Sequence, residues 1–244
     1  MATPDPSPHK FPTTSWTLIQ KVQQGPESEA QMAMEEICRA YWYPIYAFAR
    51  RSGASPHDAE DLTQAMFQKL LTHEALQDAR AEHGRLRSFF IAVLKQMIAN
   101  QHRNAMAQKR GGGGAVLNID DLQAEELYRA EPAGISDPEK LFDRAWAESV
   151  LQAAEAKLRE DFVAYKNVEI FDALRMFLSV GKNETPQAAL AKRLGMKPGT
   201  LRMQIRRMRQ QYAAHIDSEI AQTVGGGESL ESERDYLISL VNRS

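Results

Sequence analysis

The sequence is poor in cysteine, and this excludes several kinds of site. Its 244 residues contain one cysteine, Cys38, which excludes an internal disulfide and a cysteine-based zinc cluster and fits a reducing compartment. We interpret Cys38, within MEEICRAYW, as a small buried apolar residue rather than a reactive thiol. No apolar run approaches about eighteen residues, and residues 1–12 are too polar and proline-rich for a signal peptide. We therefore expect a cytoplasmic protein without a membrane segment.

Strand signals and catalytic motifs are also scarce. No run of β-branched residues alternates with polar ones, whereas a 3.6-residue apolar period recurs, so we predict an all-α fold. The glycines of RGGGGA lack the Gly-Lys-Ser/Thr of a phosphate-binding loop. The six histidines show no ligand spacing, and the sequence favours capping and solvation over metal binding for His57 beside Asp58 and Asp61. We therefore expect that the protein is not an enzyme and that it binds neither a metal ion nor a cofactor.

Charges of opposite sign are concentrated in different segments of the chain. The net charge is −2, yet residues 80–110 carry seven Lys/Arg against one acid, and residues 184–215 carry seven against one. Residues 111–163 hold twelve Asp/Glu against five Lys/Arg, and residues 216–244 hold six against two. Two basic islands separated by an acidic stretch suggest two surfaces that face nucleic acid.

Glycine, proline and periodicity divide the chain. We predict two small helical domains joined by a flexible linker, with a helix expected from Glu27 to Arg51 that Pro44 interrupts or kinks. Gly53, Ser55 and Pro56 predict the start of a further helix. The predicted segments are a disordered tail at 1–14, a first domain at 15–110, the linker at 111–137, a second domain at 138–213 and an acidic extension at 214–244.

The second basic island has the spacing of a helix-turn-helix. Thr185 and Pro186 predict one short helix that ends at Gly195, and Pro198 opens the next. One stripe of the second helix is apolar, while arginines point away from it, and no acid occurs from Thr185 to Ile216. A solvated surface helix usually alternates basic residues with acids at i+4, so we favour contact with nucleic acid over a merely solvated face.

Three ordered segments together resemble bacterial RNA polymerase sigma factors of the extracytoplasmic-function type, in the sigma-70 family. The segments are DAEDLTQAMFQKLL, GRLRSFFIAVLKQMIANQHR and ALAKRLGMKPGTLRMQIRRMRQQY. The resemblance spans about residues 15–213. It implies a subunit with a region-two domain, a linker and a region-four helix-turn-helix domain. Its implied partners are core RNA polymerase and promoter DNA, with an anti-sigma factor as a further candidate.

The resemblance also implies roles for single residues. Asp58, Asp61 and Gln64 would dock on the clamp helices of the polymerase beta-prime subunit. The helix from Arg85 to Arg103 would engage and melt the minus-ten element, and region four would read the minus-thirty-five element. The candidate DNA-binding residues are Arg85, Arg87, Lys95, Arg103, Lys197, Thr200, Arg202, Met203, Arg206 and Arg207.

The acidic segments leave several interpretations open. By resemblance, the linker acids Asp120, Asp121, Glu125 and Glu126 stand in for nucleic acid inside the polymerase. The extension 214–244 either makes an inhibitory contact with the basic region-four face or is a packing helix of that domain. Two other classes stay as alternatives: a regulator that binds DNA without polymerase through residues 185–212, and a helical protein-interaction module. The first leaves the N-terminal domain unexplained, and the second leaves the charge segregation unexplained.

Overall fold

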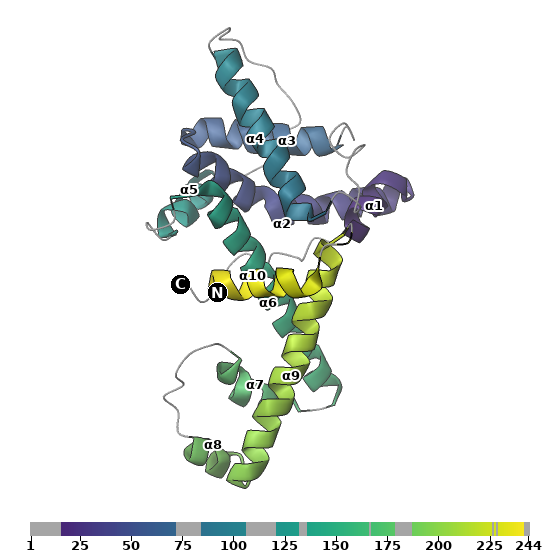
Figure 1. The fold of residues 1–244 in the computed structure, drawn as a ribbon, viewed down its shortest axis with the longest axis vertical. Coiled ribbons are helices and arrows are strands. Elements are labelled where there is room, and N and C mark those ends of the chain that lie inside the picture. Colours follow the sequence, from purple (N-terminus) through teal and green to yellow (C-terminus); the bar gives the residue numbers. More distant parts are fainter. Residues whose placement is uncertain are drawn as a thin grey trace, which may run out of the picture.

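The computed structural model describes residues 16–71, 84–105, 121–131, 136–165, 167–178, 187–225, 227 and 229–241. Within these ranges every regular element is a helix, which confirms the predicted all-α class (Figure 1). The helices are α1 (Trp16–Gln24), α2 (Glu27–Arg51), α3 (Pro56–Leu71), α4 (Leu86–Ala105), α5 (Asp121–Ala130), α6 (Pro138–Ala164), α7 (Val168–Leu174), the 3₁₀ turn η2 (Arg175–Phe177), α8 (Gln187–Arg193), α9 (Pro198–Thr223) and α10 (Leu230–Val241).

The junction between α2 and α3 forms as the sequence predicts. Gly53 has a φ of +97°, a left-handed conformation that glycine adopts without strain, and it ends the path of α2. The Oγ of Ser55 accepts a hydrogen bond from the backbone N–H of Asp58 at 3.1 Å, which is an N-cap of α3. Pro56 occupies the first helical position, where its missing N–H costs nothing.

Pro44 does not interrupt α2, so that part of the prediction is wrong. The helix runs unbroken from Glu27 to Arg51 with Pro44 inside it. A proline in a helix interior costs about 3 kcal/mol through a lost hydrogen bond and a clash. Here the residues around it, including Ile45 and Tyr46, are almost fully buried. Tertiary packing on both sides of Pro44 therefore outweighs the local penalty.

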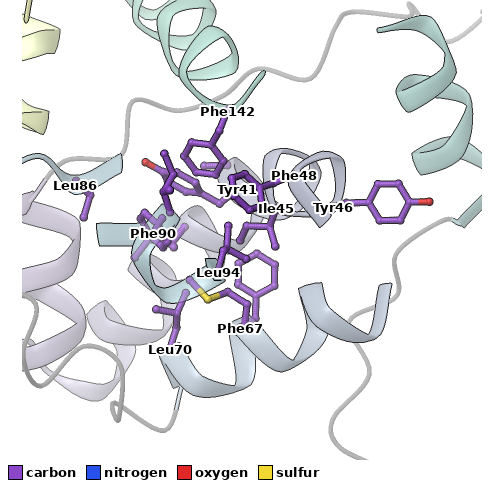
Figure 2. Packing of buried hydrophobic residues seen from close by; sticks show 14 of the residues in the cluster. Tyr41, Ile45, Tyr46, Phe48, Phe67, Leu70, Leu86, Phe90, Leu94 and Phe142 are labelled. Carbon is purple, nitrogen blue, oxygen red and sulfur yellow. The ribbon is translucent and has the colours of Figure 1, made fainter. Parts of the chain in front are cut away.

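The largest core joins the N-terminal helices to α6. Phe90 of α4 is fully buried and stacks on Tyr41 of α2 with ring centroids 4.2 Å apart. Phe142 of α6 lies 6.0 Å from the same Tyr41 ring. Figure 2 shows Phe142 beside Tyr41, with the hydroxyl of Tyr46 directed away from the cluster. This core therefore includes a residue from the segment predicted to be the second domain.

Helix α6 connects two groups of helices. It packs on α2 near its start and on α9 along much of its length (Figure 1). Two further clusters include residues of α6. One contains Leu158 near the end of α6 with Phe171 and Leu201, and the other contains Trp146 nearer its start with Ile220 and Leu237. Ala147 and Leu151 of α6 belong to the second of these clusters, and Phe162 packs against the first. The predicted domain boundary at 138 thus coincides with the start of a helix that contacts both halves.

Part of the predicted linker is a helix. Residues 121–130 form α5, in a segment predicted to be a flexible linker. Ala124 is fully buried, and the partly buried Tyr128 packs against the same core. Docking on α2 stabilises this short helix. Likewise α9 continues past the predicted end at 213 to Thr223, where Ile220 is fully buried. The short helix expected in the extension is α10.

Candidate nucleic-acid interface

A glycine turn fixes the connection between α8 and α9. Gly195 has a φ of +64°. The N–H of Met196 donates to the carbonyl of Ala191 at 2.9 Å, and the N–H of Gly195 donates to the carbonyl of Lys192 at 3.2 Å. These two bonds with a left-handed glycine make a Schellman motif, which terminates a helix and redirects the chain. Three residues later Pro198 begins α9, so two helices meet through a short defined turn. The predicted cap at Thr185 lies outside the described residues.

Helix α9 has one buried side and one basic exposed side. Leu201, Ile205 and Met208 are at most 5% exposed and pack against α8 and the preceding helices. The opposite side consists of side chains open to solvent, and Met203 is 66% exposed there. Of the candidates predicted for this helix, Thr200 is half-buried, and Lys197, Arg202, Met203, Arg206 and Arg207 are exposed.

Arg209 differs from its basic neighbours. Its Nε donates to the backbone carbonyl of Phe177 at 2.8 Å, which ties α9 to η2. Arg202, Arg206 and Arg209 also line an open groove along α9 beside Gln187 of α8. Arg209 therefore ties α9 to the preceding turn, while Arg202 and Arg206 are exposed along the groove.

Further along α9, polar contacts attach the helix to α6. The hydroxyl of Tyr212 donates to the carbonyl of Leu151 at 3.1 Å, and burial raises the pKa of this phenol. His215 Nε2 lies 2.7 Å from the Asp161 carboxylate. Both contacts lie on the C-terminal side of the candidate DNA-binding residues of α9, and they attach this part of the helix to α6.

The candidates on and before α4 are engaged in ion pairs. The side chain of Arg87 is 5% exposed, and its Nε lies 2.9 Å from Asp143 of α6. Burial lowers the pKa of Arg87, while Asp143 acts in the opposite direction. Lys95 Nζ lies 2.5 Å from Glu139 of α6. The sequence predicted these cations as DNA ligands, but in this structure carboxylates of α6 neutralise them. The side chain of Arg103 lies outside the described residues.

The C-terminal helix α10 supplies the other carboxylate. Glu233 is fully buried, and it lies 2.8 Å from Arg85 Nε and also pairs with Arg87. Of the two interpretations of the extension, packing is observed: Leu237 belongs to the cluster around Trp146 and Ile220. The acidic contact is observed too, but with α4 and its leading residues instead of the region-four face. Sequence reasoning missed Glu233 and Asp143, and its only hint was the acidity of these segments.

The candidate polymerase-docking residues lie on the outer side of α3. Asp58 is exposed and accepts a hydrogen bond from the hydroxyl of Ser55 at 2.6 Å. Asp61 is also exposed, and its carboxylate lies 3.8 Å from His57. Gln64 is half-buried and donates to Glu60 at 3.1 Å. The structure brings the three together along one helix, with Leu62 and Met66 buried on the other side.

The acidic residues of the predicted linker have different surroundings in the structure. Glu125 accepts hydrogen bonds from Nε and Nη2 of Arg50 at 3.0 and 3.1 Å, and from the hydroxyl of Tyr46 at 2.9 Å. The bond from Arg50 is the main reason that the pKa of Glu125 is lowered, and burial raises the pKa of Tyr46 to about 12. Glu126 is exposed. The charge of Glu125 therefore serves to dock α5. Asp120 and the side chain of Asp121 lie outside the described residues.

The described ranges contain neither a metal-ligand cluster nor a membrane-spanning helix. No three His, Cys, Asp or Glu side chains come together there as a metal site would require. None of the helices described is both long and apolar enough to span a bilayer.

Comparisons with known proteins agree with the resemblance noted in the sequence. Residues 38–108 match the family model for sigma-70 region 2, which covers most of α2, all of α3 and all of α4. Over 200 residues the chain is 28% identical to the ECF RNA polymerase sigma factor SigE of Mycolicibacterium smegmatis, an alignment that covers 81% of this chain and 68% of that protein. No solved structure matches the chain.

Proposed function

We propose a division of roles among three surfaces of this chain, which belongs to the sigma-70 family as an extracytoplasmic-function sigma factor and directs transcription initiation with RNA polymerase. As a sigma factor it binds core polymerase and promoter DNA. The observation that carries the division is a region-2 match over α2–α4 followed by a two-faced basic helix α9. The proposed boundaries are region two at 15–110, the linker at 111–137 and region four at 138–213.

The outer side of α3 is the proposed docking surface for the clamp helices of the beta-prime subunit. Asp58 and Asp61 are exposed carboxylates, and Gln64 presents an amide one turn further along. Buried residues hold this helix by its other side, so the three polar groups keep their spacing before the polymerase binds. An anti-sigma factor is a further proposed partner, which would act by covering this surface or the basic ones.

Helix α4 and its leading residues are proposed to engage and melt the minus-ten element. The supporting features are the basic residues Arg85, Arg87, Lys95 and Arg103 and the partly buried Phe89. An opened DNA strand is held by a basic groove together with aromatic or apolar side chains that stack on bases. Arg85, Arg87 and Lys95 are paired with carboxylates in this structure, so they would meet the first requirement once those pairs are released.

The exposed face of α9 is proposed to read the minus-thirty-five element. A major groove accommodates one α-helix, and Arg side chains at its N-terminal half can reach guanine edges, worth about 1–3 kcal/mol of discrimination each. The exposed residues there include Arg202, Met203, Arg206 and Arg207, and Lys197 is exposed directly before the helix. The two basic surfaces are weak DNA ligands separately and act together once polymerase holds them at a fixed spacing.

Catalysis of RNA synthesis belongs to the polymerase, so we propose no catalytic activity for this chain. The proposed site of action is the cytoplasm, where bacterial polymerase works. No metal or cofactor is needed for any of the three roles.

Run-off transcription with purified core polymerase tests the proposal. We expect the chain to direct transcripts from a defined start that core polymerase alone does not use. Replacing Asp58 and Asp61 with Ala should weaken binding to core polymerase, while a control replacement of Glu27 and Glu29, exposed at the start of α2, should leave it unchanged. Equal loss in both variants would argue against the α3 surface, and no specific transcript with the wild-type chain would refute the function itself.

A further inference from the structure

The cations of the proposed minus-ten surface are each paired with a carboxylate from the C-terminal part of the chain. Arg85 pairs with Glu233 of α10, Arg87 with Glu233 and Asp143, and Lys95 with Glu139 of α6. The partners come from two helices that are distant in sequence, and the Arg87–Glu233 contact spans 146 positions. Among the described side chains, the predicted α4 cations are thus neutralised by acids, while those of α9 face solvent.

The surroundings of Arg87 leave no room for a phosphate. Its guanidinium lies 4.3 Å from the centroid of the Trp146 ring and 5.0 Å from that of Tyr236, so aromatic rings cover its faces. Asp143 and Glu233 occupy its polar edges, and the hydroxyl of Tyr236 donates to Asp143 at 2.5 Å. A phosphate approaching this site would meet two carboxylates instead of a free cation.

Helix α10 is attached in two different ways. Leu237 packs with Trp146 of α6 and Ile220 of α9, so the apolar side of α10 belongs to the C-terminal group of helices. Its contact with Arg85 and Arg87 is ionic and runs through the fully buried Glu233. A buried ion pair contributes little net stability compared with apolar packing, because both charges lose their hydration. The ionic side is therefore the one that separates most readily.

We propose that α10, together with the start of α6, is an autoinhibitory latch that occupies the minus-ten surface of the free chain. This inference rests on the proposed role of α4 in promoter opening. In the free chain Glu233 and Asp143 hold Arg85 and Arg87 away from DNA. During formation of the open complex, Glu233 of α10 separates from Arg85 and Arg87, and DNA takes the place of its carboxylate, while the apolar contact of Phe142 of α6 with the N-terminal core persists. The latch thereby limits binding to DNA by the chain alone.

Two glutamate variants on the same helix test the latch. Glu233→Gln removes the buried charge, and Glu231→Gln removes an exposed charge two residues away as the control. With limiting core polymerase on a promoter template, we expect Glu233→Gln to lower the chain concentration for half-maximal transcription by roughly 5- to 30-fold, and the control to match the wild type. A merely structural ion pair predicts the opposite, because loss of fold lowers transcription. An equal or higher half-maximal concentration for Glu233→Gln would overturn the latch.

Hydrogen exchange on the wild-type chain tests the latch without any substitution. It therefore gives an answer even if the Glu233→Gln variant does not fold. We expect the amides of α10 and those at the start of α4 to be protected in the free chain, and α10 to lose protection in the open complex. Unchanged protection of α10 overturns the latch. A wild-type chain that initiates normally with an immobile α10 refutes the latch alone, whereas a chain that never initiates refutes the proposed function and the latch with it.

Discussion

Replacing Arg202, Arg206 and Arg207 of α9 with Gln removes three positive charges from the proposed reading face. These side chains are exposed, and the buried side of the helix is left intact. We therefore expect the free energy of unfolding to change by less than about 0.5 kcal/mol. Binding of the polymerase complex to promoter DNA should weaken strongly, because each cation that neutralises a phosphate also releases a counterion.

The magnitude follows from the number of charges removed. Each phosphate contact contributes about 0.9 to the slope of log affinity against log salt, so three contacts contribute about 2.7. A fourfold rise in salt should then weaken the wild type about 40-fold more than the variant. If one of the three reaches a base edge instead, the slope change falls to about 1.8, and discrimination at one base pair drops by about 1–3 kcal/mol.

The assay is fluorescence anisotropy of a labelled promoter duplex with the chain bound to core polymerase, measured over a series of salt concentrations. The matched control replaces Lys21, Arg39 and Arg159, exposed on α1, α2 and α6, with Gln. It removes the same charge from other faces and should keep the wild-type slope. Equal slopes for wild type and the α9 variant, or the same reduction in the control, would refute the assignment of this face to DNA.

Other predictions concern the framework of these surfaces. Glu125→Gln should lower the free energy of unfolding in urea by about 1–2 kcal/mol near pH 7, because the bonds from Arg50 lose their charge. Since the folded pKa of Glu125 is lowered, its stabilisation is present above the unfolded value of 4.5 and is lost as pH falls through the folded pKa, so urea midpoints of wild type and variant should converge in acid. Phe90→Ala should cost about 3–5 kcal/mol in the same assay, since the ring is fully buried; a loss below 1 kcal/mol would contradict this packing. Gly195→Ala should destabilise by about 1–2 kcal/mol through its φ of +64°, whereas Gly199→Ala, in open space on α9, should stabilise by about 0.5–1 kcal/mol in thermal melts. Shifts of the same sign for both alanines would refute the proposed turn geometry.

Local chemistry explains which parts of the fold were predictable. Ser55 and Gly195 act through bonds to residues only a few positions away, so their sequence context predicts the start of α3 and the turn before α9. The buried and exposed sides of α9 follow from periodicity alone. Local rules fail where packing overrides them, since Pro44 sits inside an unbroken helix. The glycines and acids near residues 121–130 favoured a linker there, whereas the structure has the helix α5.

The burial and ion pairing of the candidate site could not be predicted from the sequence. Residue type and spacing identify Arg87 as a cation on a basic segment, and nothing nearby indicates burial. Its partners Asp143 and Glu233 are separated from it by dozens of positions or more, and their pairing depends on how α6 and α10 fold back on α4. The acidity of the extension hinted at an internal contact, but the one considered, as one of two interpretations, was with the basic region-four face.

The most direct test of the account is a map of transcript 5′ ends. Core polymerase is incubated with fragmented genomic DNA from the source organism, with and without the purified chain, and the ends of the RNA are sequenced. We predict that the chain concentrates the 5′ ends at a set of sites that share two short sequence elements at constant spacing upstream of the start. Ends scattered equally with and without the chain would contradict the account.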